Sequence, residues 1–538
     1  MRNSASTFHS MPTIEPRRSS SDASAPSDQD PPPIAIVPDE ILHHIFLLVA
    51  GEAWDNRGTT ATLSWDDIPC LAISLVCRYW RRFALASPRL WCYLSITLHS
   101  SVEQLEAFIE RSQDRPLFVK YTGSAYIVKP DSSWGRKGIV LVDQSHRLAE
   151  FHVAELRSED VTALLSFFRK PAPLLRRLSL HAPVQLHGPS MFSRDLPSLR
   201  DIELSGILLR WIPYRDMDTM VLKDQFTPSL GRLLLTLKDC PKLRVLKLGL
   251  LGAMDSAAVL GGMSSSGDPQ PEAVHLPFLQ EFSLSSLVAH DIVAVLRYLT
   301  FPKTTAVDLK FFGHQNIPLT LARDCPSLGA IATAQESIIL ELIGALEWSA
   351  HIVLRTPDNK LQMEWEWYEA GGLPDILDTA GFSAISLPAL KHLSIVANSF
   401  RLREAQWLQI LAPVPTVRTL ALDVRNSMVL ELFSALSCTP EAESTDGPVQ
   451  LPICPEMTDL KLTHLDGPLT ILRGLVDSVE KRALHGYPLL SIEIISQAGK
   501  PLFEEICPRL RRCVGVVNVK HDDHYPTGYE PLLAHLDG

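Results

Sequence analysis

The chain has 538 residues and 46% of them are hydrophobic, so it is long enough for more than one domain and can bury a large core. The formal net charge is −11, and no run of Lys and Arg is long enough to follow a phosphate backbone, which argues against nucleic-acid binding. The nine cysteines are scattered singly and form no Cys-x-x-Cys pair, which favours free thiols in a reducing compartment over a disulfide framework.

Residues 1–33 are rich in Ser, Pro and Asp and contain no apolar core of any length. This composition predicts a disordered leader rather than a signal peptide. The longest apolar stretches further along, such as residues 338–348, are interrupted by Glu341 and Glu347 and are too short to cross a bilayer. We therefore expect a protein of the cytoplasm or nucleus that does not enter a membrane.

Residues 34–98 carry two amphipathic helical patterns. The first begins with Pro38, which suits a first helical turn, and Asp39 and Glu40 follow at the positive end of the helix dipole. Its apolar residues recur on one helical face: Ile41, Leu42, Ile45, Phe46 and Val49. Residues 68–83 predict a second helix, whose apolar residues repeat three and four apart: Leu71, Leu75, Val76, Tyr79, Trp80 and Phe83. A unit of about 50 residues cannot bury so many large side chains internally, so we expect a partner surface.

The order of these residues resembles an F-box. The likeness rests on a proline-acidic-acidic start, an Ile-Phe pair one turn later, a Val-Cys-Arg-x-Trp-Arg segment at 76–81 and a Leu-Trp end at 90–91. It implies a module that docks on a Skp-type adaptor and, through it, on a cullin. The adaptor contacts that it implies are Pro38, Ile41, Leu42, Ile45, Phe46, Leu75, Val76, Cys77, Trp80, Leu90 and Trp91. The alternative is an ordinary helical subdomain packed on the rest of the chain.

The connection between the two helical patterns is longer than is usual in F-box proteins. Residues 51–60 hold two glycines, Asn56 and paired threonines, and residues 61–67 follow before the second helix. Such a composition predicts a surface loop, and surface loops tolerate insertions. The insertion puts in doubt the contacts of this segment but leaves the two helical faces intact.

Residues 99–538 repeat the pattern Pro-x-apolar-x-x-apolar-x-apolar. Copies begin at Pro173, Pro197, Pro228, Pro241, Pro277, Pro388, Pro415 and Pro455. We interpret each copy as a proline that ends the preceding segment, followed by a short strand with alternating leucines. Pro228 and Pro241 are too close to begin separate units, and an interval of 62 residues separates Pro326 from Pro388.

Helical patterns lie between the strands, for example at residues 291–299 and 430–436. This alternation resembles an irregular leucine-rich-repeat solenoid, with parallel strands on the concave face and helices on the convex face. The alternative is a non-repetitive α/β domain with leucine-rich strands.

No catalytic motif stands out: the sequence holds no phosphate loop, no His-Glu-x-x-His helix and no Gly-x-Ser-x-Gly elbow. The Gly-rich segment 261–268 is followed by prolines and predicts a flexible loop. The cluster at residues 521–524 has metal-compatible donors but is interpreted as a solvated tail. We therefore expect no metal and no cofactor. Alternation in residues 363–368 places Trp365 and Trp367 on one strand face, which indicates either the edge of the core or an aromatic recognition patch.

Together these patterns predict a small all-α F-box module followed by an α/β leucine-rich-repeat-like solenoid. The function expected from the resemblance is a non-catalytic substrate receptor of a Skp-cullin-F-box ubiquitin ligase, with an unknown protein substrate. A leucine-rich interaction scaffold is the alternative, and the exposure of Ile41, Phe46 and Trp80 bears on the choice. A hydrolase is the third reading, which a cleft with converging His and acidic side chains would indicate.

Overall fold

The computed structural model describes most of the chain between residues 37 and 521. Within this span it leaves out residues 56–68, 98, 124–132, 188–190, 193–195, 209–213, 227–228, 252–271, 287, 313–324, 346–348, 368–386, 398–401, 425–428, 438–452, 466–468 and 497–499. The expected leader, residues 56–67 of the predicted loop, the Gly-rich segment 261–268 and residues 522–524 therefore lie outside the described residues.

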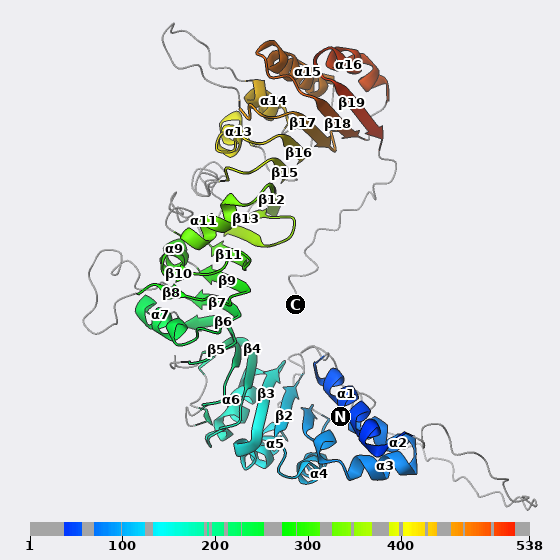
Figure 1. The fold of residues 1–538 in the computed structure, drawn as a ribbon, viewed down its shortest axis with the longest axis vertical. Helices are drawn as coiled ribbons and strands as arrows, with labels where there is room; N and C mark the ends of the chain where they lie inside the picture. Colours follow the sequence, from blue (N-terminus) through cyan, green and yellow to red (C-terminus); the bar gives the residue numbers. More distant parts are fainter. Residues whose placement is uncertain are drawn as a thin grey trace, which may run out of the picture.

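Seventeen strands form one open sheet that runs along the described chain (Figure 1). Among the described strands, neighbours are parallel except where β13 lies antiparallel to the strands on either side. In spatial order the strands are β1 (Tyr93–Ile96), β2 (Leu117–Thr122), β3 (Leu148–Ala154), β4 (Arg177–His187), β5 (Asp201–Leu208), β6 (Thr219–Phe226), β7 (Val245–Leu251), β9 (Glu281–Ser286), β11 (Ala306–Phe312), β14 (Leu361–Trp367), β13 (Ser349–Arg355), β12 (Ser337–Ala345), β15 (His392–Ala397), β16 (Thr419–Val424), β17 (Asp459–Thr463), β18 (Ser491–Ser496) and β19 (Val516–His521).

One hairpin interrupts the sequential order of the strands. β14 pairs with β11 and β12 pairs with β15, so the hairpin of β13 and β14 lies between β11 and β12. Its residues fall in the 62-residue interval between Pro326 and Pro388, where the proline pattern has no further copy. The interval is therefore long because it holds an extra hairpin within the same sheet.

Helices cover one face of the sheet and lie on the outer side of the arc in Figure 1. They are α4 (Val102–Ser112), α5 (Ser133–Val142), α6 (Ser158–Phe167), α7 (Leu230–Lys238), α9 (Ala289–Tyr298), α11 (Pro326–Thr333), α13 (Glu404–Leu411), α14 (Val429–Ser437), α15 (Leu469–Leu484) and α16 (Lys500–Cys513). A second, two-stranded sheet pairs β8 (Val274–His275) with β10 (Leu299–Thr300). We call the side that carries these helices the helix-covered face and the opposite side the open face. The arrangement is an α/β solenoid-like stack, and the helices expected at residues 291–299 and 430–436 are confirmed.

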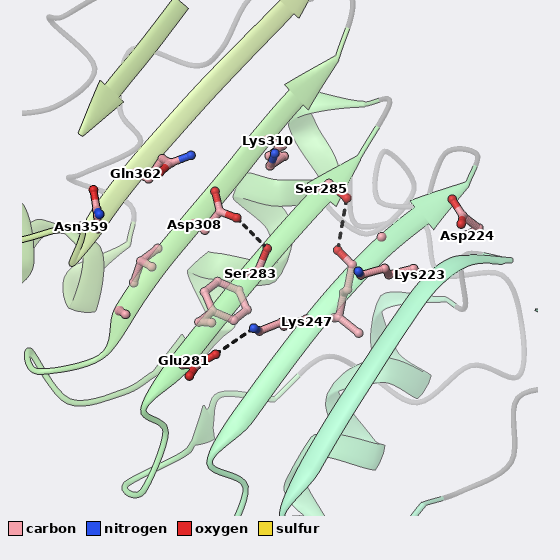
Figure 2. Close-up of a pocket in the computed structure, with 15 residues that line it drawn as sticks. Lys223, Asp224, Lys247, Glu281, Ser283, Ser285, Asp308, Lys310, Asn359 and Gln362 are labelled. Atoms are coloured by element: carbon pink, nitrogen blue, oxygen red, sulfur yellow. Dashed lines mark hydrogen bonds and ion pairs between the residues drawn. The ribbon is translucent and has the colours of Figure 1, made fainter. Parts of the chain in front are cut away.

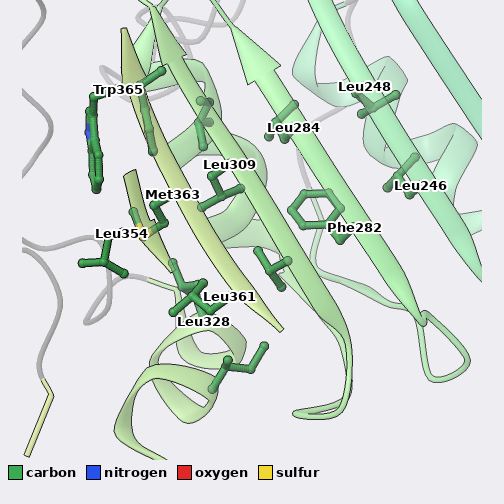
Figure 3. Packing of buried hydrophobic residues seen from close by; sticks show 14 of the residues in the cluster. Leu246, Leu248, Phe282, Leu284, Leu309, Leu328, Leu354, Leu361, Met363 and Trp365 are labelled. Carbon is green, nitrogen blue, oxygen red and sulfur yellow. The ribbon is translucent and has the colours of Figure 1, made fainter. Parts of the chain in front are cut away.

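The leucine pattern supplies the side chains of the helix-covered face. In β9, Phe282 and Leu284 are buried while Glu281, Ser283 and Ser285 reach the open face, because successive side chains of a strand alternate between faces. Figure 3 shows the buried residues of β7, β9, β11 and β14 in one layer with Leu328 of α11. The strands predicted after seven of the prolines are confirmed: Pro173, Pro197, Pro241, Pro277, Pro388, Pro415 and Pro455.

The strand predicted after Pro228 is wrong, because this segment forms helix α7. Leu230, Leu233 and Leu237 are buried and repeat at intervals of three and four residues, which is the period of one helical face. Leu235, which a strand would bury on the same face as Leu233, is 51% exposed.

The N-terminal residues form helices α1 (Asp39–Asp55), α2 (Pro69–Val76) and α3 (Arg78–Leu85), followed by the 3-10 turn η3 (Pro88–Trp91). The single helix expected over residues 68–83 is broken at Cys77. The backbone of Cys77 is extended, and its thiol accepts a hydrogen bond from the Trp80 N–H at the start of α3. The loop expected from Gly51 is wrong over residues 51–55, because these residues belong to α1.

Candidate functional site

The residues predicted for adaptor contact divide into a buried and an exposed group. Leu42, Phe46, Leu90 and Trp91 are each 1% exposed and belong to the hydrophobic core. Phe46 packs edge-on against the half-buried Trp80, with the ring centroids 4.7 Å apart. These side chains hold α1, α3 and η3 together, and the surface of the module is formed by others.

Trp91 joins this helical module to the next helix. Its indole Nε1 donates a hydrogen bond of 2.8 Å to the Ala84 carbonyl at the end of α3. Its ring lies 5.1 Å from the Phe108 ring of α4, and the Arg111 guanidinium lies 4.5 Å from the Trp91 ring centroid. The module is therefore packed onto the chain that follows it.

The second group is exposed and apolar. Six large aliphatic side chains of α1 and α2 are between 42% and 69% exposed: Ile41, Ile45, Leu48, Val49, Leu75 and Val76. We call these six residues the apolar surface. Pro38 and Cys77, which were also predicted contacts, are exposed as well. Exposed aliphatic groups in this number are costly in water, so the apolar surface has the character of a docking face.

Sequence analysis did not single out Leu48. It follows Ile45 by three residues and Ile41 by seven, which places it on the same side of α1 as both of them. The helical period alone could therefore have added it to the predicted contacts.

The junction of α2 and α3 lies beside the start of α1. The Tyr79 hydroxyl donates a hydrogen bond to the Asp39 carboxylate, and this bond raises the pKa of Tyr79. Arg81 Nε donates a hydrogen bond of 2.9 Å to the Ser74 carbonyl and so ties α3 to α2. The end of α2, with its two exposed aliphatic side chains, is therefore fixed near the start of α1.

Trp54 anchors the other end of α1 on the open face of the sheet. Its buried indole donates a hydrogen bond of 3.1 Å from Nε1 to Glu150 Oε2 of β3. Its ring centroid lies 5.8 Å from that of His152 and 6.3 Å from that of Phe118. Figure 1 shows α1 across the first strands from α5 and α6. Because α1 carries four residues of the apolar surface, this anchoring also fixes how the apolar surface is oriented relative to the sheet.

Glu150 is the centre of a cluster of polar contacts. His152 Nε2 lies 3.1 Å from its carboxylate and Arg177 Nη1 lies 3.7 Å away, while Arg177 Nε is 3.5 Å from Asp201. Burial opposes the ionisation of Glu150, but the hydrogen bonds from His152 and Trp54 and the charge of Arg177 outweigh burial and lower its pKa. Glu150 is therefore an anion at neutral pH, which strengthens its bond to the indole.

A groove lies on the open face between β6 and β14 (Figure 2). It encloses about 630 Å³ and is lined by β6, β7, β9, β11 and β14. Its ionisable side chains are Lys223, Asp224, Lys247, Glu281, Asp308 and Lys310, and its other polar side chains are Ser283, Ser285, Asn359 and Gln362. The groove therefore offers many hydrogen-bonding groups with lysines and acids in equal number.

Ion pairs across neighbouring strands order the groove. Lys247 Nζ lies 2.8 Å from Glu281, and Lys310 Nζ lies 2.8 Å from Glu364. Glu364 also accepts a hydrogen bond of 2.7 Å from His351 Nε2. Burial opposes the ionisation of Glu364, but the bonds from His351 and Lys310 prevail and lower its pKa to about 2.

Asp308 is the least compensated acid of the groove. Ser283 donates a hydrogen bond of 3.1 Å to Asp308 Oδ2, whereas Oδ1 is buried and has no hydrogen-bond partner among the described residues. Burial raises the pKa of Asp308, although the charge of Lys310 opposes this. Keeping Asp308 ionised in the groove therefore lowers the free energy of unfolding.

Trp365 belongs to the core rather than to an aromatic recognition patch. It is 5% exposed, and its ring is stacked on Phe311 with a centroid distance of 5.5 Å. Glu364 lies on the opposite face of β14, so the predicted alternation of Trp365 and Glu364 is confirmed. The side chain of Trp367 lies outside the described residues.

The described residues contain no group of three or more His, Cys, Asp or Glu side chains that could hold a metal ion. Histidine is absent from the lining of the groove, so this cleft lacks the converging His and acidic side chains that the hydrolase reading requires. Among the helices in the described ranges, none combines the length and apolarity needed to cross a membrane. In comparisons with known proteins, no family model matches the chain, and no curated protein matches it.

Proposed function

We propose that this chain is the substrate-recognition subunit of a Skp-cullin-F-box ubiquitin ligase. In this proposal α1 to η3 form the F-box module, and the stacked strands form a leucine-rich-repeat-like receptor for a protein substrate. The observation that carries the proposal is the apolar surface on α1 and α2, which the chain leaves exposed. The order of residues that resembles an F-box supplies the identity of the partner, a Skp-type adaptor.

The energy available from the apolar surface is moderate. Full burial of a Val, Leu or Ile side chain stabilises by about 1.5–3 kcal/mol, so the six half-exposed side chains would contribute roughly 5–9 kcal/mol in total. Association costs about 4–15 kcal/mol, so over most of this range the apolar contacts need additional polar contacts. The exposed charged residues near the apolar surface in the sequence are Asp39, Glu40, Glu52, Arg78, Arg81 and Arg82.

A pull-down of the purified chain with a recombinant Skp-type adaptor tests the proposal. The double variant Ile45→Asp, Leu75→Asp should lose the adaptor and keep the melting temperature of the wild type, because both side chains are exposed. Leu484→Asp is the matched control, since Leu484 at the end of α15 is 84% exposed and far from the module in sequence. Failure of the wild type to retain the adaptor, or equal retention by the double variant, would overturn the proposal.

An interaction scaffold outside any ubiquitin ligase is the second candidate. It is favoured by the burial of Leu42, Phe46, Leu90 and Trp91 in the chain's own core and by the anchoring of Trp54 on the sheet. A scaffold would bind its partners through the open face and leave the adaptor unbound. The same pull-down separates the two candidates, because only the ligase subunit retains the adaptor.

A further inference from the structure

The last strand of the sheet, β19, has one edge that no described strand pairs. Its other edge pairs in parallel with β18 (Figure 1). The Val516 N–H donates a hydrogen bond of 2.9 Å to the Leu490 carbonyl, so the backbone groups of Val516 face β18. Backbone groups alternate in direction along a strand, so those of Asn518 and Lys520 face β18 as well. The N–H and C=O groups of Val517 and Val519 therefore face outwards.

The apolar layer of the helix-covered face is also incomplete at β19. Val517 and Val519 are aligned with Ile492 and Ile494 of β18 and belong to the same face. Ile492 and Ile494, which have a strand on each side, are 1% and 0% exposed. Val517 and Val519 pack against the same core but are only half-buried. One more strand beside β19 would cover them and pair the outward backbone groups.

The residues of β19 suit pairing with a second copy of the same strand. In an antiparallel pair centred on Asn518, Val517 lies opposite Val519 of the second copy. Each outward valine then exchanges both backbone hydrogen bonds with a valine of the other copy, so all the outward groups of these valines are paired. The two Asn518 side chains face each other, and each amide offers a donor and an acceptor to the other.

Charge favours the same register. Lys520 is exposed on the open face, and the residue opposite it in this register is Val516 of the second copy, which is 61% exposed. The two copies of Lys520 are then about 13 Å apart along the strand direction, since four residues separate positions 516 and 520. A shift that brings Asn518 opposite Lys520 reduces this separation to about 7 Å. The centred register is therefore the one that pairs the whole strand and keeps the lysines apart.

We propose that this chain forms a homodimer in which the β19 strands of two copies pair antiparallel and join the two sheets into one. The interface is isologous, because the same edge serves both copies and the two-fold axis passes between the two Asn518 residues. A second copy is favoured over an unrelated strand, because residues 516–520 complement themselves in backbone direction, apolar layer and charge. The contact is short, so we expect a dimer that dissociates on dilution.

Sedimentation velocity of the full chain, at concentrations from about 1 to about 100 µM, measures the dimer. We expect the sedimentation coefficient to rise with concentration from the value of a monomer to that of a dimer. The double variant Ile45→Asp, Leu75→Asp should dimerise like the wild type, which shows that association does not use the apolar surface on α1 and α2.

Two substitutions of Val516 test the register. Val516→Lys places an ammonium group opposite Lys520 of the second copy, and this repulsion occurs twice in the dimer, so the dimer should be about tenfold weaker. Val516→Glu is the matched control, because it removes the same valine but faces Lys520 with a carboxylate. It should dimerise at least as tightly as the wild type, and the difference between the two variants should shrink at high salt.

Val519→Pro tests the backbone pairing. Proline removes the N–H that faces outwards and leaves the hydrogen bonds to β18 in place, which is the position where an edge strand tolerates proline. The variant should remain monomeric over the same range of concentration. Its circular dichroism melt shows whether it is folded, and the two Val516 variants test the proposal without a change to the backbone.

Four results would overturn the inference. The first is a wild type that stays monomeric up to about 100 µM, which would leave a strand of another protein as the occupant of the edge. The second is equal dimer dissociation constants of Val516→Lys and Val516→Glu. The others are dimerisation of folded Val519→Pro at wild-type strength and loss of the dimer in Ile45→Asp, Leu75→Asp. None of these results depends on the adaptor, so the dimer and the ligase proposal fail or stand separately.

Discussion

Replacing Trp54 tests whether the N-terminal module and the sheet form one folded unit. Trp54→Phe keeps an aromatic ring among Phe118 and His152 but removes the Nε1 donor to Glu150. A hydrogen bond to a charged group contributes about 1.5–3 kcal/mol. Glu150 keeps its bond from His152 and its pair with Arg177, so we expect a loss of about 1.5–2 kcal/mol in the free energy of unfolding, at the lower end of this range.

Trp365→Phe is the control for the smaller ring. The indole Nε1 of Trp365 is buried without a hydrogen-bond partner among the described residues, so its removal takes no hydrogen bond from any of these residues. Both substitutions leave a similar cavity, so the difference between their losses of stability reports the hydrogen bond to Glu150. Trp54→Ala, which removes the whole buried ring, should cost about 3–5 kcal/mol.

Hydrogen exchange followed by mass spectrometry is the assay, because it measures local opening free energies along a long chain. Trp54→Phe should speed exchange in α1 and in β1 to β3 and leave β15 to β18 unchanged. The pKa of Glu150 is lowered in the folded state, so the bond contributes above the ordinary pKa of Glu and fades as pH falls through the lowered value. Equal losses of local stability in Trp54→Phe and Trp365→Phe would refute the reasoning. Unaltered hydrogen exchange in β2 and β3 of Trp54→Ala would refute it as well.

Three further substitutions are measured by thermal unfolding. Asp308→Asn should raise the melting temperature at pH 7, because burial raises the pKa of Asp308 and disfavours its charged form. This gain should vanish below about pH 3.9, where Asp308 of the wild type is protonated in both the folded and the unfolded state. Glu364→Gln should lower the free energy of unfolding by about 1–3 kcal/mol at pH 7, and this loss should shrink as the pH falls from 4.5 towards 2. Equal changes of the melting temperature in the Asp308 and Glu364 variants at pH 7 would contradict both assignments. Arg147→Lys should be destabilising, because the buried guanidinium donates to Ile109, Ser112 and other acceptors at the end of α4, and an ammonium cannot reproduce that fork; a wild-type melting temperature would show otherwise.

Local periodicity predicted the strands of this chain because every second residue of each strand must be apolar to pack in the core. Leu178 and Leu180, or Leu460 and Leu462, are separated by two residues and enter the same hydrophobic layer. The inserted hairpin could not be predicted in the same way. Its strands have recognisable apolar segments, but the pairing of β14 with β11 is a choice between distant partners that no local pattern records.

The division of the predicted adaptor contacts into buried and exposed sets has a geometric origin. At about 100° per residue, Ile41, Ile45, Val49, Leu42 and Phe46 follow one another around α1 within about 140°. The first three are exposed and the last two are buried, so the core contacts only one edge of a continuous apolar stripe. The sequence defines the stripe, whereas the packing of α3 decides where the core ends.

The end of α1 could have been predicted further than it was. Ala50 and Trp54 continue the spacing of four residues from Phe46, and all three are buried. The loop-forming composition around Asn56 outweighed this signal, although α1 continues through Asp55.

The hairpin of β13 and β14 makes part of the open face exchangeable. It enters the sheet between β11 and β12 and supplies Gln362 to the groove, while the turn before β14 supplies Asn359. Strands β15 to β19 join the hairpin only through β12, on the far side of the ladder. We therefore expect that a hairpin with other open-face residues, but with Leu361, Met363 and Trp365 kept in the core, can be grafted here without rebuilding β15 to β19. The same stack of strands could then present a different set of polar side chains at this point, with its other strands unchanged.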